Sequence, residues 1–175
     1  MMKSSVLKPV WTALLALGLV ASISGCAQVS SAKPGTPIAD VLKQYGKPVV
    51  TCPTKDGGQR MVWTQQPEGD TAYAVQVPKS GLIEAPQQVL STESFKVMSN
   101  GEVWTREMVH CQFGPPANIS RDGIGNEEWI WGYRYLRAGD DAQMMYVYLG
   151  STGASVTRYV SQPDPERNPE VMGRR

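Results

Sequence analysis

The sequence has little of what most catalytic and metal sites require. His110 is its only histidine, and neither a nucleophile motif nor a partner at metal-ligand spacing accompanies it. The glycine-containing stretch 122–126 resembles a hairpin loop, because no Gly-Lys-Ser/Thr follows it as in a phosphate-binding loop. Adjacent carboxylates occur at 127–128 and 140–141, but neighbours on a strand point to opposite faces. These absences predict a protein that is not an enzyme and holds no metal or cofactor.

The sequence also lacks an excess of charge of either sign. It has 17 basic and 16 acidic residues, and Lys3 and Lys8 are the only charged residues before Cys26. A chain beginning at Cys26 would therefore carry 15 basic residues against 16 acidic ones. Such a balance excludes the basic footprint of a nucleic-acid-binding protein and a polybasic patch for anionic membranes. We therefore expect any membrane attachment to come from a lipid.

Only one long hydrophobic run is present, and it lies at the beginning of the chain. It covers residues 10–23, follows two lysines, and is too short to span a bilayer comfortably. Small residues then lead to Cys26, in the order Ile23-Ser24-Gly25-Cys26. This pattern is typical of a secretion signal. With the cysteine it resembles a bacterial lipoprotein signal, whereas an ordinary cleaved signal is the alternative.

The lipoprotein resemblance implies a compartment and an anchor. Residues 1–25 would be removed, and Cys26 would become the first residue and carry the lipid, palmitate included. Ala27 and Gln28 follow, with no aspartate that would resemble an inner-membrane retention signal. We therefore expect an outer-membrane protein whose polar residues 26–34 act as anchor and tether for a periplasmic domain.

Two further cysteines, Cys52 and Cys111, remain in the exported part. In an oxidising compartment such a pair is a candidate disulfide. Its loop of about 60 residues would contribute on the order of 4 kcal/mol by the chain-entropy model. Two unpaired thiols are the alternative, because the sequence does not fix the distance between the two Cα atoms.

Residues 35–48 carry the signals of one short helix. Thr36 can cap it and Pro37 suits its first position, whereas Gly46 ends it and Pro48 prevents its continuation. The apolar side chains between them follow helical spacing: Ile38, Val41, Leu42 and Tyr45. Because so short a helix is marginal alone in water, its apolar stripe is expected to pack on a sheet.

Strand-like segments follow this helix. Residues 60–64 and 71–77 predict two antiparallel strands joined by a turn at 67–70, and 81–83 predict a third short strand. Residues 92–98 are ambiguous. Either residues 95–98 and 102–104 form a hairpin that turns at 99–101, or residues 92–98 form a short helix.

Several residues recur 68 positions further along the chain. The matching pairs are Val41 and Val109, Tyr45 and Phe113, Gly46 and Gly114, Pro48 and Pro116, Gly57 and Gly125, and Trp63 and Trp131. A constant offset at structural positions indicates an internal repeat. We therefore predict an α+β fold of two tandem repeats, 35–90 and 91–160. Each would have one or two helices on a small antiparallel sheet.

The second copy resembles a known family. Thr105, Arg106, Val109 and residues 113–116 resemble the opening of the BamE (SmpA/OmlA) family of outer-membrane lipoproteins, and the aromatic strand within 125–131 fits its next element. A tandem pair is also similar to the β-lactamase-inhibitor-protein architecture, in which two such repeats form one concave surface. The resemblance implies a non-enzymatic protein that binds other proteins, including the machinery that inserts β-barrels. An inhibitor or regulator of a periplasmic enzyme is the alternative.

Alternating aromatic residues are the main candidates for a binding surface. One strand carries Trp129, Trp131, Tyr133 and Tyr135, and Tyr146 and Tyr148 alternate in the same way on the next. These rings form either the core beneath the helices or an exposed protein-binding platform, because aromatic side chains serve both purposes.

Two further expectations concern His110 and the C-terminus. His110 matches Leu42 in the first repeat, which favours a structural, hydrogen-bonded histidine on the buried stripe over a catalytic one. Residues 161–175 combine charges of both signs with three prolines and few apolar side chains. Their composition predicts a disordered tail.

Overall fold

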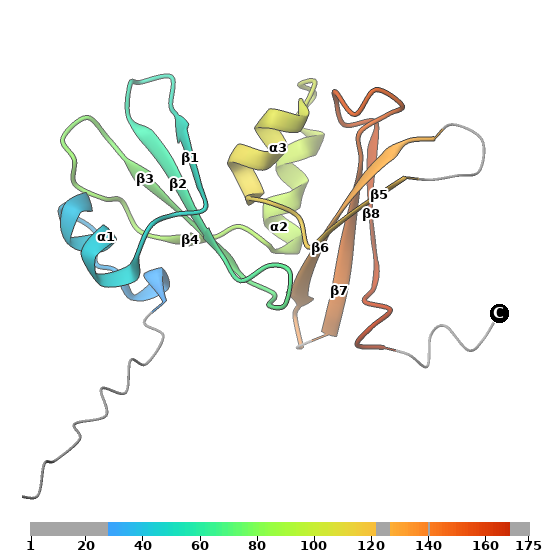
Figure 1. The fold of residues 1–175 in the computed structure, drawn as a ribbon, viewed down its shortest axis with the longest axis horizontal. Helices are drawn as coiled ribbons and strands as arrows, with labels where there is room; N and C mark the ends of the chain where they lie inside the picture. Colours follow the sequence, from blue (N-terminus) through green and yellow to red (C-terminus); the bar gives the residue numbers. More distant parts are fainter. Residues whose placement is uncertain (1–27, 122–126, 140, 169–175) are drawn as a thin grey trace, which may run out of the picture.

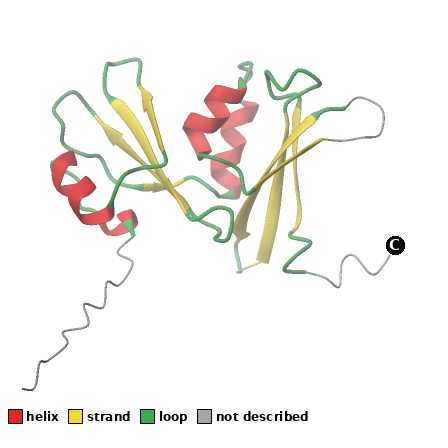
Figure 2. Cartoon of the chain, in the orientation of Figure 1, coloured by secondary structure: helices red, strands yellow, loops and turns green. Residues whose placement is uncertain are grey.

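The structure, a computed structural model, describes residues 28–121, 127–139 and 141–168. These residues form two consecutive halves, each containing a four-stranded antiparallel sheet (Figures 1 and 2). The first half consists of η1 Val29–Ser31, α1 Ile38–Tyr45, β1 Val50–Pro53, β2 Gln59–Thr64, β3 Ala72–Val77 and β4 Gln87–Gln88. The second consists of α2 Thr92–Phe95, η2 Lys96–Ser99, α3 Arg106–Phe113, β5 Asn118–Arg121, β6 Trp129–Arg137, β7 Asp141–Tyr148 and β8 Arg158–Pro163. The α+β class predicted from the sequence is confirmed.

The two longer helices end where the sequence predicts, but α1 begins one residue later than predicted, at Ile38 and not at Pro37. The Thr105 hydroxyl caps α3 by accepting a hydrogen bond from the Met108 amide at 3.2 Å. Gly46 ends α1 with φ 78° and Gly114 ends α3 with φ 85°, a conformation that favours glycine. The expected Thr36 cap is wrong, because this hydroxyl donates instead to the Lys33 carbonyl at 2.7 Å.

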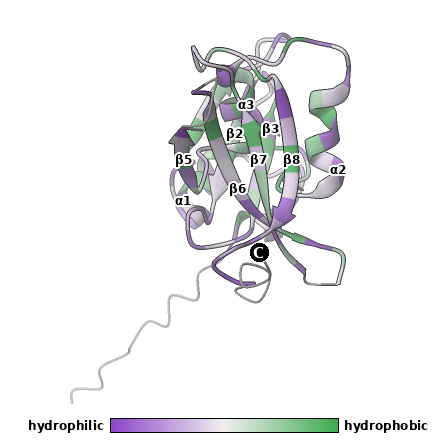
Figure 3. Cartoon of the chain, turned by 90° about the vertical axis from the view of Figure 1, so that its right-hand side faces the viewer, coloured by the Kyte–Doolittle hydropathy of each residue, from purple (hydrophilic) through white to green (hydrophobic). Residues whose placement is uncertain are grey.

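Helices cover both faces of the first sheet. Met61 of β2 packs with Val41 of α1, whereas the next residue, Val62, points to the opposite face and joins a cluster that contains Val109 of α3. The same cluster includes Tyr133 of the second sheet. The layers are therefore α1, the first sheet, α2 with α3, and the second sheet (Figure 1). The face of the second sheet that points away from α3 is turned toward the viewer in Figure 3. No helix in the described part of the chain covers this face.

The ambiguous segment before α3 is helical. Ser91 caps α2 by accepting a hydrogen bond from the Ser94 amide, and η2 continues the turn to Ser99. Phe95 and Met98 are buried against the central cluster, so this short helix is held by its tertiary contacts. The hairpin alternative is therefore wrong. The predicted strand at 81–83 is reduced to a single bridge between Pro37 and Leu82, and Gln87–Gln88 supply the fourth strand instead.

The two halves share several spacings. The helix α3 and the strand β5 begin 68 residues after α1 and β1, and each pair has equal length. The amide of the first helical residue donates to a loop carbonyl in both halves, Ile38 to Gly81 and Arg106 to Ala154, at 2.9 Å. The two accepting residues, Gly81 and Ala154, lie 73 residues apart and not 68, because the strands of the second sheet are longer.

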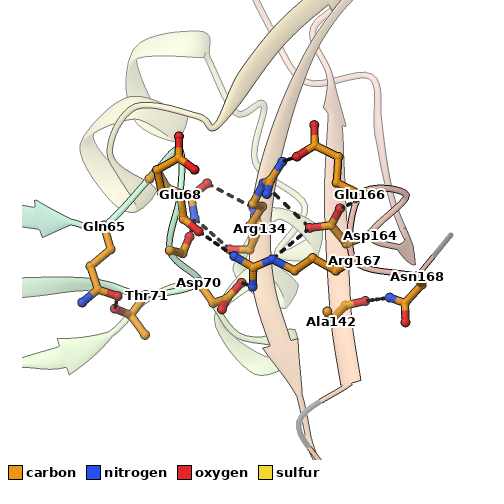
Figure 4. Close-up of polar contacts among 12 residues, drawn as sticks. Gln65, Glu68, Asp70, Thr71, Arg134, Ala142, Asp164, Glu166, Arg167 and Asn168 are labelled. Carbon is orange, nitrogen blue, oxygen red and sulfur yellow. Dashed lines mark hydrogen bonds and ion pairs between the residues drawn. The ribbon is translucent and has the colours of Figure 1, made fainter.

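A polar cluster joins the C-terminal segment to the two halves (Figure 4). The Gln66 side-chain amide accepts a hydrogen bond from the Arg134 backbone amide at 3.2 Å and donates to its carbonyl at 3.0 Å. Arg167 pairs with Asp70 of the β2–β3 loop at 2.5 Å. The Arg134 side chain pairs with Glu166 and, at 3.7 Å, with the fully buried Asp164.

The predicted disordered tail is therefore wrong for residues 161–168. Strand β8 extends to Pro163 and pairs with β7 along its length. Beyond it, the amides of Asp164 and of the Asn168 side chain both donate to the Ala142 carbonyl. Composition favoured disorder, but these long-range contacts order the segment. Residues 169–175 lie outside the described part of the chain.

Candidate functional site

Most of the predicted aromatic platform is the core of the protein. Trp131, Tyr133 and Tyr135 share one face of β6, as predicted, but that face packs against α2 and α3, and they are 9%, 0% and 1% exposed. The Phe95 and Phe113 rings lie 4.8 Å apart within this cluster. The core interpretation is confirmed, and the platform interpretation is wrong for these three residues.

Buried tyrosine hydroxyls in this core have hydrogen-bond partners. The Tyr133 hydroxyl donates to the Gly114 carbonyl at 3.1 Å, and the Tyr135 hydroxyl shares a hydrogen bond with Ser161 at 2.6 Å. Burial raises the pKa of Tyr133 well above its ordinary value, because the charged phenolate would lose its hydration. Tyr133 therefore stabilises the end of α3 and is inaccessible to a partner.

Tyr146 and Tyr148 do not share a face of the second sheet with Trp131. Tyr146 pairs with Gly132 and Tyr148 pairs with Ile130, so both tyrosines lie on the outer face of the second sheet. There the Arg158 guanidinium stacks 3.5 Å from the Tyr148 ring centroid. Trp129 is half-buried on the inner face. The six predicted aromatic residues therefore do not form one platform, because the strand register puts Tyr146 and Tyr148 on the face opposite to the other four.

The candidate disulfide between Cys52 and Cys111 is confirmed. It joins β1 to α3 across a Cα–Cα distance of 5.9 Å. Beside it, the Arg60 side chain donates to the Cys111 and Gln112 carbonyls, both at 3.1 Å. A cation at the C-terminus of a helix is favourable. Burial lowers the pKa of Arg60, since its charge is partly desolvated.

A cavity of about 420 Å³ lies between α3 and β5. We call it the α3–β5 cavity, and its lining residues are Arg106, Glu107, His110, Pro115, Pro116, Ile119 and Trp131. Ile119 is 56% exposed and pairs with Trp131 across the two strands, so both side chains lie on the face toward the cavity. An exposed isoleucine beside an apolar hollow is a feature typical of a binding surface.

His110 is half-buried, as is Leu42, the residue that it matches in the first half. Its imidazole lies at the wall of the α3–β5 cavity and meets the Trp131 ring edge-on at a centroid distance of 6.2 Å. Among the described residues, its side chain forms no hydrogen bond. The expected structural hydrogen bond is therefore absent from this part of the chain.

A second cavity lies on the opposite side of α3. It measures about 540 Å³, and its lining residues are Thr51, Cys52, Pro53, Thr54, Arg60, Thr105, Glu107, Met108 and Cys111. Glu107 lines both cavities, which places its carboxylate on the exposed crest of α3. The two hollows therefore flank one helix on the same side of the molecule.

The adjacent carboxylates have separate partners. Glu127 pairs with Arg121 at 3.5 Å, whereas Glu128 pairs with Arg158, so the two acids do not share a site, as predicted. Asp141 pairs with Arg137. Within the described ranges, no three His, Cys, Asp or Glu residues are grouped as metal ligands.

Some predicted positions lie outside the described residues. They are Cys26, Asp140 and the loop 122–126. Among the helices that the structure describes, none has the length and hydropathy needed to cross a membrane.

Sequence reasoning missed the cavity and the strand that borders it. Ile119 is a lone apolar residue in a four-residue strand and carries no periodic pattern, so its only signal was its place three residues after Pro116. The Arg134–Asp164 contact was missed because 30 residues separate its partners. No protein-family model, curated protein or solved structure matches the chain.

Proposed function

We propose that this protein is an outer-membrane lipoprotein, with its lipid on Cys26, that acts as a non-enzymatic protein-binding module on the periplasmic face. Its role would lie in outer-membrane protein assembly or envelope maintenance. The signal-like residues 1–25 support export and lipidation. The absence of aspartate at Ala27 and Gln28 supports the outer membrane.

In this proposal the two halves are tandem copies of one BamE-like unit. Three features support that interpretation: the constant offset of 68 residues between matching helices and first strands, the glycine that ends each helix, and the equivalent hydrogen bonds before each helix. The family role then supports binding of proteins rather than chemistry on a substrate, although fold alone does not determine function.

The α3–β5 cavity is the observation that carries the binding function. Its volume of about 420 Å³ lies within the range of ligand and side-chain pockets. Its apolar lining consists of Trp131, two prolines and the mostly exposed Ile119, and charged residues lie at its rim. Such a combination of apolar centre and polar border is typical of interface hot spots.

A second function, inhibition or regulation of a periplasmic enzyme, rests on the shared position of Glu107. Because this residue lines the cavities on both sides of α3, the two hollows and the helix crest form one surface. A surface of this breadth suits the face of a folded enzyme as well as a single peptide segment.

The test is to identify what the full-length lipidated protein binds, with and without the cavity. Cells are crosslinked, the protein is purified in mild detergent, and the partners are compared with those of an Ile119→Glu variant. The Ile119 side chain is exposed, so the added carboxylate should change the surface and leave the fold intact. We expect barrel-insertion components to be recovered with the unmodified protein and to be lost with the variant.

Val103→Glu is the matched control, because Val103 is 75% exposed and does not line either cavity. It introduces the same charge at another apolar position and should retain the partners. Recovery of one soluble periplasmic enzyme would favour the regulator instead. Equal recovery with both variants would contradict binding through the α3–β5 cavity.

A further inference from the structure

The strand β5 is an exposed edge of the second sheet. Edge strands expose backbone N–H and C=O groups that can pair with another chain, and proline is a common protection because it lacks an N–H. Of the other edge strands, β1 ends at Pro53, β4 has only two residues, and β8 has five residues before its terminal Pro163. The strand β5 has four residues, all exposed and none of them proline. Unlike β8, it borders the α3–β5 cavity.

The α3–β5 cavity lies beside this open edge. Ile119 of β5 and Trp131 of β6 are register partners, so their side chains share the face that turns toward α3. A further strand paired with β5 would place every second side chain on this same face. Those side chains would enter the cavity, so backbone pairing and apolar burial would act together.

Charges near the edge favour a partner that carries carboxylates. Arg106 lines the cavity and has no ion pair with any residue that the structure describes. Arg121 lies over Trp129, at 4.8 Å from the ring, and its pair with Glu127 is exposed on both sides. Glu107 also lines the α3–β5 cavity. It lies on the exposed crest of α3, however, and borders the second cavity as well.

We propose that β5 binds an extended segment of a partner protein by strand addition, with an apolar side chain and flanking carboxylates turned toward α3. The inference rests on the protein-binding function proposed above and specifies the form of the partner. A second copy of this chain fits less well, because pairing of β5 with itself would bring the Arg106 and Arg121 cations of both copies to one edge.

The probe is a seven-residue peptide, acetylated and amidated, with glutamate, valine and glutamate at positions two, four and six and threonine elsewhere. These even positions share one face of a strand. Hydrogen exchange of the full-length lipidated protein in mild detergent is followed by mass spectrometry. We expect the peptide to slow exchange in residues 117–121 and to leave β8 unchanged.

Three comparisons test the mechanism. N-methylation of alternate residues blocks the N–H groups on one edge of the peptide, so one of the two possible sets should abolish protection of β5. Replacement of both glutamates by lysine should weaken binding. Arg106→Gln should weaken it about threefold, the effect of one exposed ion pair. Arg137→Gln, which removes an arginine paired with Asp141 elsewhere in the sheet, should leave it unchanged.

Strand addition is overturned if both N-methylated peptides protect β5 as well as the unmodified one, or if millimolar peptide protects β8 or neither strand. A β5-dependent dimer without peptide would also overturn it, in favour of a second copy. The outcome is separable from the proposed function. Partners that depend on Ile119 without peptide protection would contradict only strand addition. Peptide protection without any recovered partner would contradict only the cellular role.

Discussion

Removing the disulfide between Cys52 and Cys111 should lower the free energy of unfolding by about 4 kcal/mol. The cysteines are 59 residues apart, and the chain-entropy model assigns on the order of 4 kcal/mol to a loop of that size. The perturbation is the double substitution Cys52→Ala with Cys111→Ala, in a chain that also carries Cys26→Ser and therefore has no other thiol.

The loss should be concentrated around α3. The disulfide ties this helix to β1, an edge strand of the first sheet, whereas Val109 and Phe113 hold it to the central cluster. Without the covalent bond, we expect amide exchange to accelerate most in α3 and β1. The polar contacts of Arg167 with the β2–β3 loop remain and should keep the two halves joined.

Urea unfolding followed by tryptophan fluorescence provides the measurement. The parent chain with Cys26→Ser should show the same loss when it is treated with dithiothreitol, and dithiothreitol should not affect the double variant. A loss below about 1 kcal/mol in both experiments would refute the loop-entropy argument. A loss in the double variant without any effect of reductant would instead indicate that the alanines themselves disturb packing.

Two other predictions concern the central core. Phe113→Ala should lower the free energy of unfolding by about 3–5 kcal/mol. The reason is that the Phe113 ring is fully buried and contacts the Phe95, Trp104 and Tyr133 rings. A change below about 1 kcal/mol in urea unfolding would contradict that packing. Tyr133→Phe should cost about 1 kcal/mol at neutral pH through the lost hydrogen bond to Gly114. Burial raises the pKa of Tyr133 above the value of about 10 in an unfolded chain, so its contribution is complete below about pH 10 and decreases as pH rises further. The parent chain should therefore lose stability more steeply than Tyr133→Phe above about pH 10, and parallel curves would contradict this.

Signals within a few residues of sequence predicted where the two longer helices end and which face of β6 its aromatic residues share. The glycines after Tyr45 and Phe113 end both helices because their positive φ is unfavourable for residues with a side chain. Period-two alternation correctly put Trp131, Tyr133 and Tyr135 on one face of a strand. The sequence was misleading for short elements, because few residues carry their pattern. The strand predicted at 81–83 is only a single bridge, and the two-residue strand β4 was not predicted.

The sequence by itself determined where helices α1 and α3 end, which residues of β6 share a face, and that Cys52 and Cys111 could pair. These properties follow from backbone sterics and from spacing within a few residues, or from the count of cysteines. Only the tertiary structure decided that α3 lies between two sheets, which turns the aromatic face of β6 into core and leaves Ile119 at an open edge. It also ordered residues 164–168, because their partners on Asp70, Arg134 and Ala142 are distant in sequence and become neighbours only after the sheets have formed.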